Sequence, residues 1–86
     1  MVETVVKVML PSGLHARPAS NFVKLAGKFG SQVFLEKQGN VTNAKSIIGI
    51  MSMAVTSGTE VIVRAEGDDA QQAVQELVEF LSRDEE

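Results

Sequence analysis

The segment 13–19 holds the side chains best suited to chemistry, because it contains the only histidine of the chain and an arginine two positions later. A neutral imidazole nitrogen is a nucleophile, and a guanidinium can neutralise the charge of a phosphate group. Gly13 permits an unusual backbone turn, and Pro18 suits the first turn of a helix. We therefore expect His15 at a helix N-terminus, where free amides and the helix dipole favour an anion.

Each neighbour of His15 has a role if the imidazole carries a phosphoryl group. Phosphoryl transfer requires mainly alignment and charge stabilisation, which the amides of Ala16 and Arg17 and the Arg17 side chain could provide. The chain has no cysteine, and no second acid, base or metal cluster accompanies the histidine, so we expect no metal or cofactor. Carrying a phosphoryl group fits these residues better than catalytic turnover, although a lone histidine at a helix end is also a common structural residue.

A second segment of interest begins at Ser46. A serine ahead of the apolar run 47–53 is typical of a helix N-cap, and Gly49 indicates that the helix is short. On residue type alone, an ordinary cap is the better interpretation. The run nevertheless holds more large apolar side chains than a short helix can bury on one face, so we expect some of them to face solvent or a partner. The methionines of the run suit a surface that adapts to several partners.

The rest of the sequence predicts the elements that position these two segments. Alternating apolar residues indicate strands, and apolar residues spaced three or four apart indicate amphipathic helices. The predicted order is β-α-β-β-α-β-α, which favours an α+β open-faced β-sandwich with helices on one face of a mostly antiparallel sheet. The expected elements are a strand at 2–10, a helix at 16–29, a hairpin of 32–37 with 41–42, a short helix after Ser46, a strand at 60–66 and a final helix after Asp69.

Apolar spacing and end signals make the helix predictions specific. Gly30 fits the position just past the end of the first helix, and Asp68 or Asp69 can cap the start of the last one. The first helix is expected to bury Ala16, Ala19, Phe22, Val23, Ala26 and Phe29, and the last to bury Ala70, Ala73, Val74, Leu77 and Leu81.

Length and composition predict one compact domain over residues 1–86, with 44% apolar residues. No apolar run is long enough to cross a bilayer and no signal peptide precedes the first strand, so we expect a soluble cytoplasmic protein. The net charge of −3, the acidic end at 84–86 and the absence of Trp and Tyr argue against nucleic acid as a partner.

Two motifs resemble those of a known family. Gly13-Leu14-His15-Ala16-Arg17-Pro18-Ala19 resembles the phosphohistidine signature of HPr, the phosphocarrier family of the bacterial sugar phosphotransferase system. Lys45-Ser46-Ile47-Ile48-Gly49-Ile50-Met51-Ser52 resembles the serine-centred signature of the same family. The resemblance covers essentially the whole chain and implies a four-stranded antiparallel sheet with three helices on one face.

The resemblance also implies roles and partners. His15 would be phosphorylated on Nδ1 by enzyme I, with phosphoenolpyruvate as the source, and would pass the group to enzyme IIA domains. Arg17 would neutralise the phosphate, and Ser46 would be the regulatory site of HPr kinase/phosphorylase, with catabolite control protein A as a further partner. Ile47, Ile48 and Met51 match the apolar docking patch of the family. The protein would be a monomer that reaches membrane permeases only through enzyme II.

Two alternatives stay open. The stretches 34–37 and 43–46 resemble the HPr paralogue used only in catabolite repression, which lacks the active-site histidine that this chain has. A mainly regulatory binding module, of the catabolite-repression or nitrogen-signalling type, is therefore the alternative to the phosphocarrier. A generic ligand- or RNA-binding domain is disfavoured, because the sequence indicates neither a basic face nor exposed aromatic residues.

Overall fold

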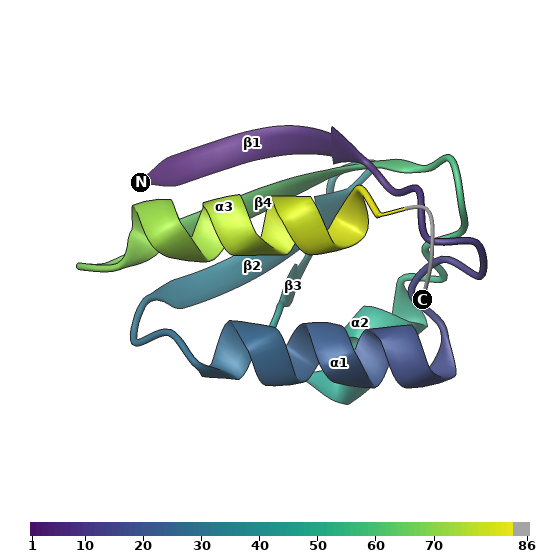
Figure 1. The fold of residues 1–86 in the computed structure, drawn as a ribbon, viewed down its shortest axis with the longest axis horizontal. Helices are drawn as coiled ribbons and strands as arrows, with labels where there is room; N and C mark the ends of the chain where they lie inside the picture. Colours follow the sequence, from purple (N-terminus) through teal and green to yellow (C-terminus); the bar gives the residue numbers. More distant parts are fainter. Residues whose placement is uncertain (84–86) are drawn as a thin grey trace.

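The computed structural model, which describes residues 1–83, is a four-stranded antiparallel sheet with three helices on one face (Figure 1). The predicted β-α-β-β-α-β-α order and α+β open-faced β-sandwich are confirmed. The predicted acidic end, 84–86, lies outside the described residues. The elements are β1 (Val2–Lys7), α1 (Ala16–Gly27), β2 (Gln32–Lys37), β3 (Asn40–Asn43), α2 (Ile47–Ser52), β4 (Glu60–Glu66) and α3 (Ala70–Leu81).

Strand β4 lies inside the sheet, in the order β1-β4-β2-β3. Its alternate residues Val61, Val63 and Ala65 are buried, because successive side chains of a strand point to opposite faces and only one face is covered by helices. The register places Val61 opposite Val6 of β1, and Ala65 opposite Val33 of β2. These apolar side chains form the sheet side of the core.

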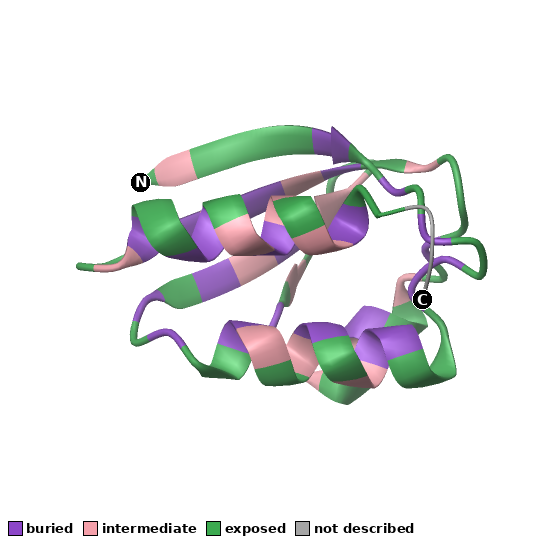
Figure 2. Cartoon of the chain, in the orientation of Figure 1, coloured by how far each residue is buried: buried purple, intermediate pink, exposed green. Residues whose placement is uncertain are grey.

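The helices close the core from the other side. Helix α3 packs on β4, β1 and β2, whereas α1 packs against α2 and α3, and α2 lies against β3. Figure 2 shows buried and exposed residues alternating along α1 and α3, as expected for amphipathic helices. The rings of Phe22 on α1 and Phe80 on α3 lie 6.0 Å apart between centroids. Every residue predicted for the inner face of α3 is buried: Ala70, Ala73, Val74, Leu77 and Leu81.

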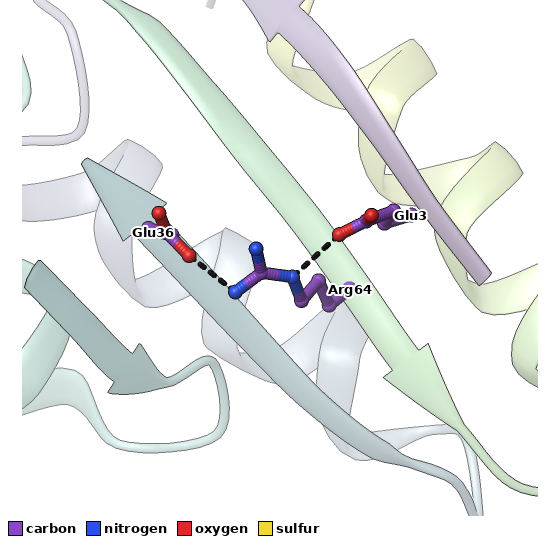
Figure 3. Close-up of polar contacts among 3 residues, drawn as sticks. All are labelled: Glu3, Glu36 and Arg64. Carbon is purple, nitrogen blue, oxygen red and sulfur yellow. Dashed lines mark hydrogen bonds and ion pairs between the residues drawn. The ribbon is translucent and has the colours of Figure 1, made fainter. Parts of the chain in front are cut away.

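The uncovered face of the sheet carries a charged network (Figure 3). Arg64 of β4 lies between Glu3 of β1 and Glu36 of β2, with its Nε 2.6 Å from Glu3 Oε2 and its NH1 bonded to Glu36 Oε1. The hydrogen bond to Glu3, and then that to Glu36, raises the pKa of the Arg64 guanidinium further above its usual range. The network therefore links three neighbouring strands on the side without helices.

Two predicted boundaries were too long. Strand β1 ends at Lys7 rather than at residue 10, because the amides of Val8 and Met9 donate to Thr59 O and Leu81 O, each at 2.8 Å, instead of to a strand partner. Helix α1 ends at Gly27 rather than at residue 29. The amide of Lys28 then donates to Leu25 O at 3.1 Å, and so tightens the last turn.

Two predicted end signals act differently from the prediction. Gly30 does not end α1, since Lys28 is the C-cap, and the Gly30 amide instead donates to Asp69 Oδ2 at 2.9 Å. Asp69 occupies the N-cap position of α3, but its carboxylate does not cap that helix. It accepts hydrogen bonds from Ser31 as well, and so joins the start of α3 to the start of β2.

Candidate functional site

The loop before α1 is held rigidly from both sides. The Gly13 amide donates to Leu10 O at 2.9 Å, and the amide of the buried Leu14 donates to Val55 O at 2.9 Å. Gly13 has φ +66°, and a Cβ there would lie 2.3 Å from Val55 O. Because that contact is with backbone, only glycine fits at this position. The loop therefore delivers the next residue, His15, in a defined place.

His15 is exposed at the N-cap position of α1, as predicted, with extended backbone (φ −125°, ψ 142°). Its side chain makes no capping hydrogen bond. The next residue, Ala16, has φ +47°, a left-handed conformation that costs a non-glycine residue on the order of 1–2 kcal/mol. Ala16 is exposed, so the prediction that it belongs to the inner face of α1 was wrong.

Arg17 and Pro18 complete the first turn of α1. Pro18 is buried and needs no amide partner there, whereas Arg17 is exposed. Within residues 1–83, the Arg17 side chain makes no hydrogen bond or ion pair, so its guanidinium is available to a ligand. The amides of Ala16 and Arg17 belong to the first turn, where a helix leaves its N–H groups without intrahelical acceptors. His15, Arg17 and these amides thus all belong to one helix N-terminus.

A surface hollow of about 230 Å³ joins His15 to the second segment of interest. His15 and Leu14 form one side of it, and Met51 of α2 forms another. The start of α1 and the exposed side of α2 therefore belong to one continuous surface. The remaining lining residues are Ser12, Ala54, Val55 and Thr56.

Ser46 is the N-cap of α2, which confirms the prediction. Its Oγ accepts a hydrogen bond from the Gly49 amide at 3.1 Å. Gly49 also lets α2 approach β3, because a Cβ there would lie 2.1 Å from Thr42 Oγ1. The preceding Lys45 donates from Nζ to Phe29 O at 2.8 Å and so ties this helix start to the segment after α1. Ser46 does not line the hollow beside His15.

The apolar run after Ser46 divides between core and surface. Ile50 is fully buried, whereas Ile48 is 77% exposed and Met51 is 45% exposed. Ile47 is exposed too, and Met53 is partly buried against the core. The prediction that the run exceeds what one helix face can bury is thus confirmed. We call Ile47, Ile48 and Met51 the apolar patch.

Sequence patterns gave no sign of the contact that fixes the segment after α2. Lys37 of β2 donates from Nζ to Met53 O at 2.8 Å and to Ala54 O at 3.0 Å. These carbonyls follow the end of α2, where a cation stabilises unpaired acceptors. A lysine facing a helix C-terminus becomes visible only when β2 and α2 are placed together in space.

Neither a metal-binding cluster nor a membrane-spanning helix is found in the part of the chain that the structure describes. No group of three or more His, Cys, Asp or Glu residues there could hold a metal ion. None of the helices there combines the length and apolarity required to span a bilayer.

Comparisons with known proteins match nearly the whole chain. A family model described as "PTS HPr component phosphorylation site" matches residues 2–83. The HPr-like protein Crh of Bacillus subtilis (strain 168) is 50% identical over 84 residues, which cover 98% of this chain and 99% of the relative.

Solved structures are similar over nearly the whole chain. A phosphocarrier protein HPr from Bacillus anthracis str. Ames matches with a TM-score of 0.93 at 43% identity, covering 94% of this chain and 96% of that one. A selenomethionyl form of Crh from Bacillus subtilis matches with a TM-score of 0.78 at 49% identity, covering 100% and 99%. That Crh is described as an intertwined dimer with a swapping domain.

Proposed function

The chain belongs to the HPr family, and on that premise we propose that it carries a phosphoryl group on His15 between a phosphorylated donor and an acceptor protein. The observation that carries the proposal is an exposed imidazole at the start of α1, beside an available guanidinium and continuous with an exposed apolar patch. The patch offers a docking area, and the helix start offers an anion site.

The transfer follows from these positions. The unprotonated Nδ1 of His15 attacks the phosphorus atom held by enzyme I, so that an N–P bond forms on His15 as the bond to the donor breaks. The amides of Ala16 and Arg17 and the Arg17 guanidinium hold the phosphoryl oxygens and offset their charge. The same step with an enzyme IIA histidine as nucleophile removes the group. The chain is therefore a stoichiometric carrier rather than an enzyme.

Incubation with enzyme I and labelled phosphoenolpyruvate tests the proposal. We expect one acid-labile phosphate per chain, mapped to His15, and no label on His15→Ala. An unchanged thermal unfolding transition of that variant shows that the fold is intact. Label that persists on folded His15→Ala contradicts the assignment.

We further propose that Ser46 is a regulatory phosphorylation site for HPr kinase/phosphorylase. Ser46 caps α2 directly beside Ile47 of the apolar patch, and the similarity to Crh of Bacillus subtilis, a catabolite repression HPr, favours a link to catabolite repression. Phosphoserine adds about −1.5 to −2 charges at a helix N-terminus, where the helix dipole favours them. The same charge beside the patch repels an acidic partner and attracts an arginine-bearing one, for which we propose catabolite control protein A.

Separate phosphorylation of the two sites tests this regulation. We expect phosphorylated Ser46 to slow acceptance at His15 from enzyme I, and Ser46→Asp to reproduce the effect in part. Ser46→Ala, which removes the acceptor oxygen without adding charge, is the matched control. Equal acceptance rates for the phosphorylated, Asp and Ala forms would exclude the switch.

A mainly regulatory module remains the second candidate, because the similarity to Crh is as extensive as that to HPr structures. The presence of His15 favours the carrier. We propose that residues 1–86 act as one monomeric, cytoplasmic unit that meets permeases only through enzyme II. Light scattering after size exclusion tests the monomer against a dimer of the kind described for Crh.

A further inference from the structure

Three of the four methionines are exposed, and their surroundings differ; Met1 is 74% exposed. Met51 is 45% exposed and Met9 is 42% exposed, whereas Met53 is partly buried against the core. Met9 lies beside the end of α3, where its amide donates to Leu81 O. Of the described methionines, only Met51 lines the hollow beside His15.

Met51 also belongs both to this hollow and to the apolar patch on α2. It follows Ile47 by four residues, so the two side chains are neighbours on one side of α2. A thioether at this place contributes an adaptable apolar contact to whatever protein approaches His15. A sulfoxide at the same place is polar and chiral, and it must lose its hydration when that protein docks.

We propose that the Met51 thioether is an oxidation site whose conversion to the sulfoxide weakens docking at His15 while leaving the histidine intact. The oxidant is a peroxide. The sulfur lone pair forms an S–O bond with one oxygen of hydrogen peroxide, the O–O bond breaks, and water leaves. The sulfur loses two electrons, and the peroxide gains them. This inference rests on the proposed phosphoryl acceptance at His15.

Met51 differs from Met9 in its position beside His15 and not in its expected rate of oxidation. Met9 is about as exposed, so both residues should oxidise at similar rates under the same peroxide, and only oxidation of Met51 should change the hollow. Met51 is not expected to touch the transferred phosphoryl group. Its oxidation should therefore raise the KM of the phosphoryl donor protein for this chain and leave kcat nearly unchanged.

The experiment compares wild type, Met51→Leu and Met9→Leu before and after hydrogen peroxide, with peptide mass mapping of each methionine. The rate of His15 phosphorylation is measured against chain concentration, and each protein is compared with its own untreated sample. We expect KM to rise about tenfold in treated wild type and Met9→Leu, the effect of burying one unpaired polar group, and to stay constant in Met51→Leu. A methionine sulfoxide reductase should restore wild type.

The possible outcomes distinguish failure of the proposed phosphoryl acceptance from failure of the proposed oxidation site. An untreated chain that takes no phosphate contradicts the proposed function, and the inference that rests on it. An untreated chain that takes phosphate, combined with an equal loss in treated Met51→Leu and wild type, overturns the oxidation site alone. The same holds if treated wild type keeps its KM although mass mapping shows Met51 oxidised.

Discussion

The carboxylate of Asp69 accepts hydrogen bonds from both the amide and the hydroxyl of Ser31, with the amide nitrogen 3.0 Å from Asp69 Oδ1. The two residues are 38 positions apart in the chain. The contact joins the start of α3 to the start of β2, and Ser31 follows the end of α1 opposite to the end at which His15 lies. The Ser31 hydroxyl, followed by the Gly30 amide, lowers the pKa of Asp69 below its usual range.

We predict that Asp69→Asn lowers the urea midpoint at neutral pH. An acid whose pKa is lowered by folding stabilises the fold while it is ionised, and this contribution disappears as pH falls through the lowered pKa. The difference in stability between wild type and variant should therefore hold from pH 7 down to the ordinary aspartate pKa of about 3.9, and shrink only below it. Asp68→Asn, at the exposed neighbouring residue, is the control, and its stability should depend on pH as that of wild type does. If the stability of Asp68→Asn instead approached that of wild type at low pH as Asp69→Asn does, the loss of one negative charge anywhere in this region would explain the effect.

Gly13→Ala should damage the loop that holds His15. The added Cβ would meet Val55 O at 2.3 Å and would force a left-handed φ on alanine. We expect a loss of about 1–3 kcal/mol in the free energy of unfolding, measured by urea titration, with slower phosphoryl acceptance. Gly27→Ala is the control. Gly27 is the last residue of α1, and a Cβ added there would meet no atom within 4 Å, so the substitution should leave stability unchanged or raise it by about 1 kcal/mol. If Gly13→Ala were as stable as wild type, the close approach of Val55 O to Gly13 would be wrong.

Ile48 and Ile50 lie on the same helix, one exposed and one buried, so their substitutions distinguish an effect on docking from an effect on stability. Ile50→Ala should cost about 2–5 kcal/mol of stability, because its side chain is fully buried. Ile48→Ala should change stability by no more than about 0.5 kcal/mol, yet raise the KM of enzyme I for this chain about tenfold if the exposed side chain is a docking contact. Thermal unfolding and initial phosphorylation rates distinguish the two. An unchanged KM for Ile48→Ala would remove Ile48 from the docking patch.

Arg17→Ala should reduce kcat/KM for phosphorylation of His15 by about 10- to 100-fold, because one charged donor to the phosphoryl oxygens is lost. Arg17→Lys should recover part of the rate, since an ammonium keeps the charge but not the forked geometry. Lys24→Ala removes a cation from the last turn of the same helix and should have a much smaller effect. Equal losses in Arg17→Ala and Lys24→Ala would indicate only a general attraction between the proteins.

Periodicity and end signals predicted the elements well because each depends on neighbours in sequence. The buried face of α3, the cap at Ser46 and the position of His15 at the start of α1 all follow from residues within a few turns. The signals that misled were local too. Asp69 has the residue type of a cap, yet its carboxylate is drawn to Ser31 across the fold.

Contacts between distant segments lay beyond that reasoning. The pairing of Arg64 with Glu3 depends on the register of β1 against β4, and that of Lys37 with Met53 O depends on where α2 lies over the sheet. The left-handed Ala16 is a further case, since alanine is an ordinary helix residue and only the fixed loop before it imposes the turn. The roles assigned to His15, Arg17, Ser46 and the apolar patch stay predictions until the experiments above are done.

Helices cover only one face of the sheet, which has a practical consequence for anyone who needs to immobilise the protein. Val5 is exposed on the bare face, opposite Ile62, and the chain contains no cysteine. A single Val5→Cys substitution would therefore give one thiol for a fluorophore, a tether or a sensor chip. The hollow beside His15 and the cap of α2 would point away from the support, ready for partners in solution.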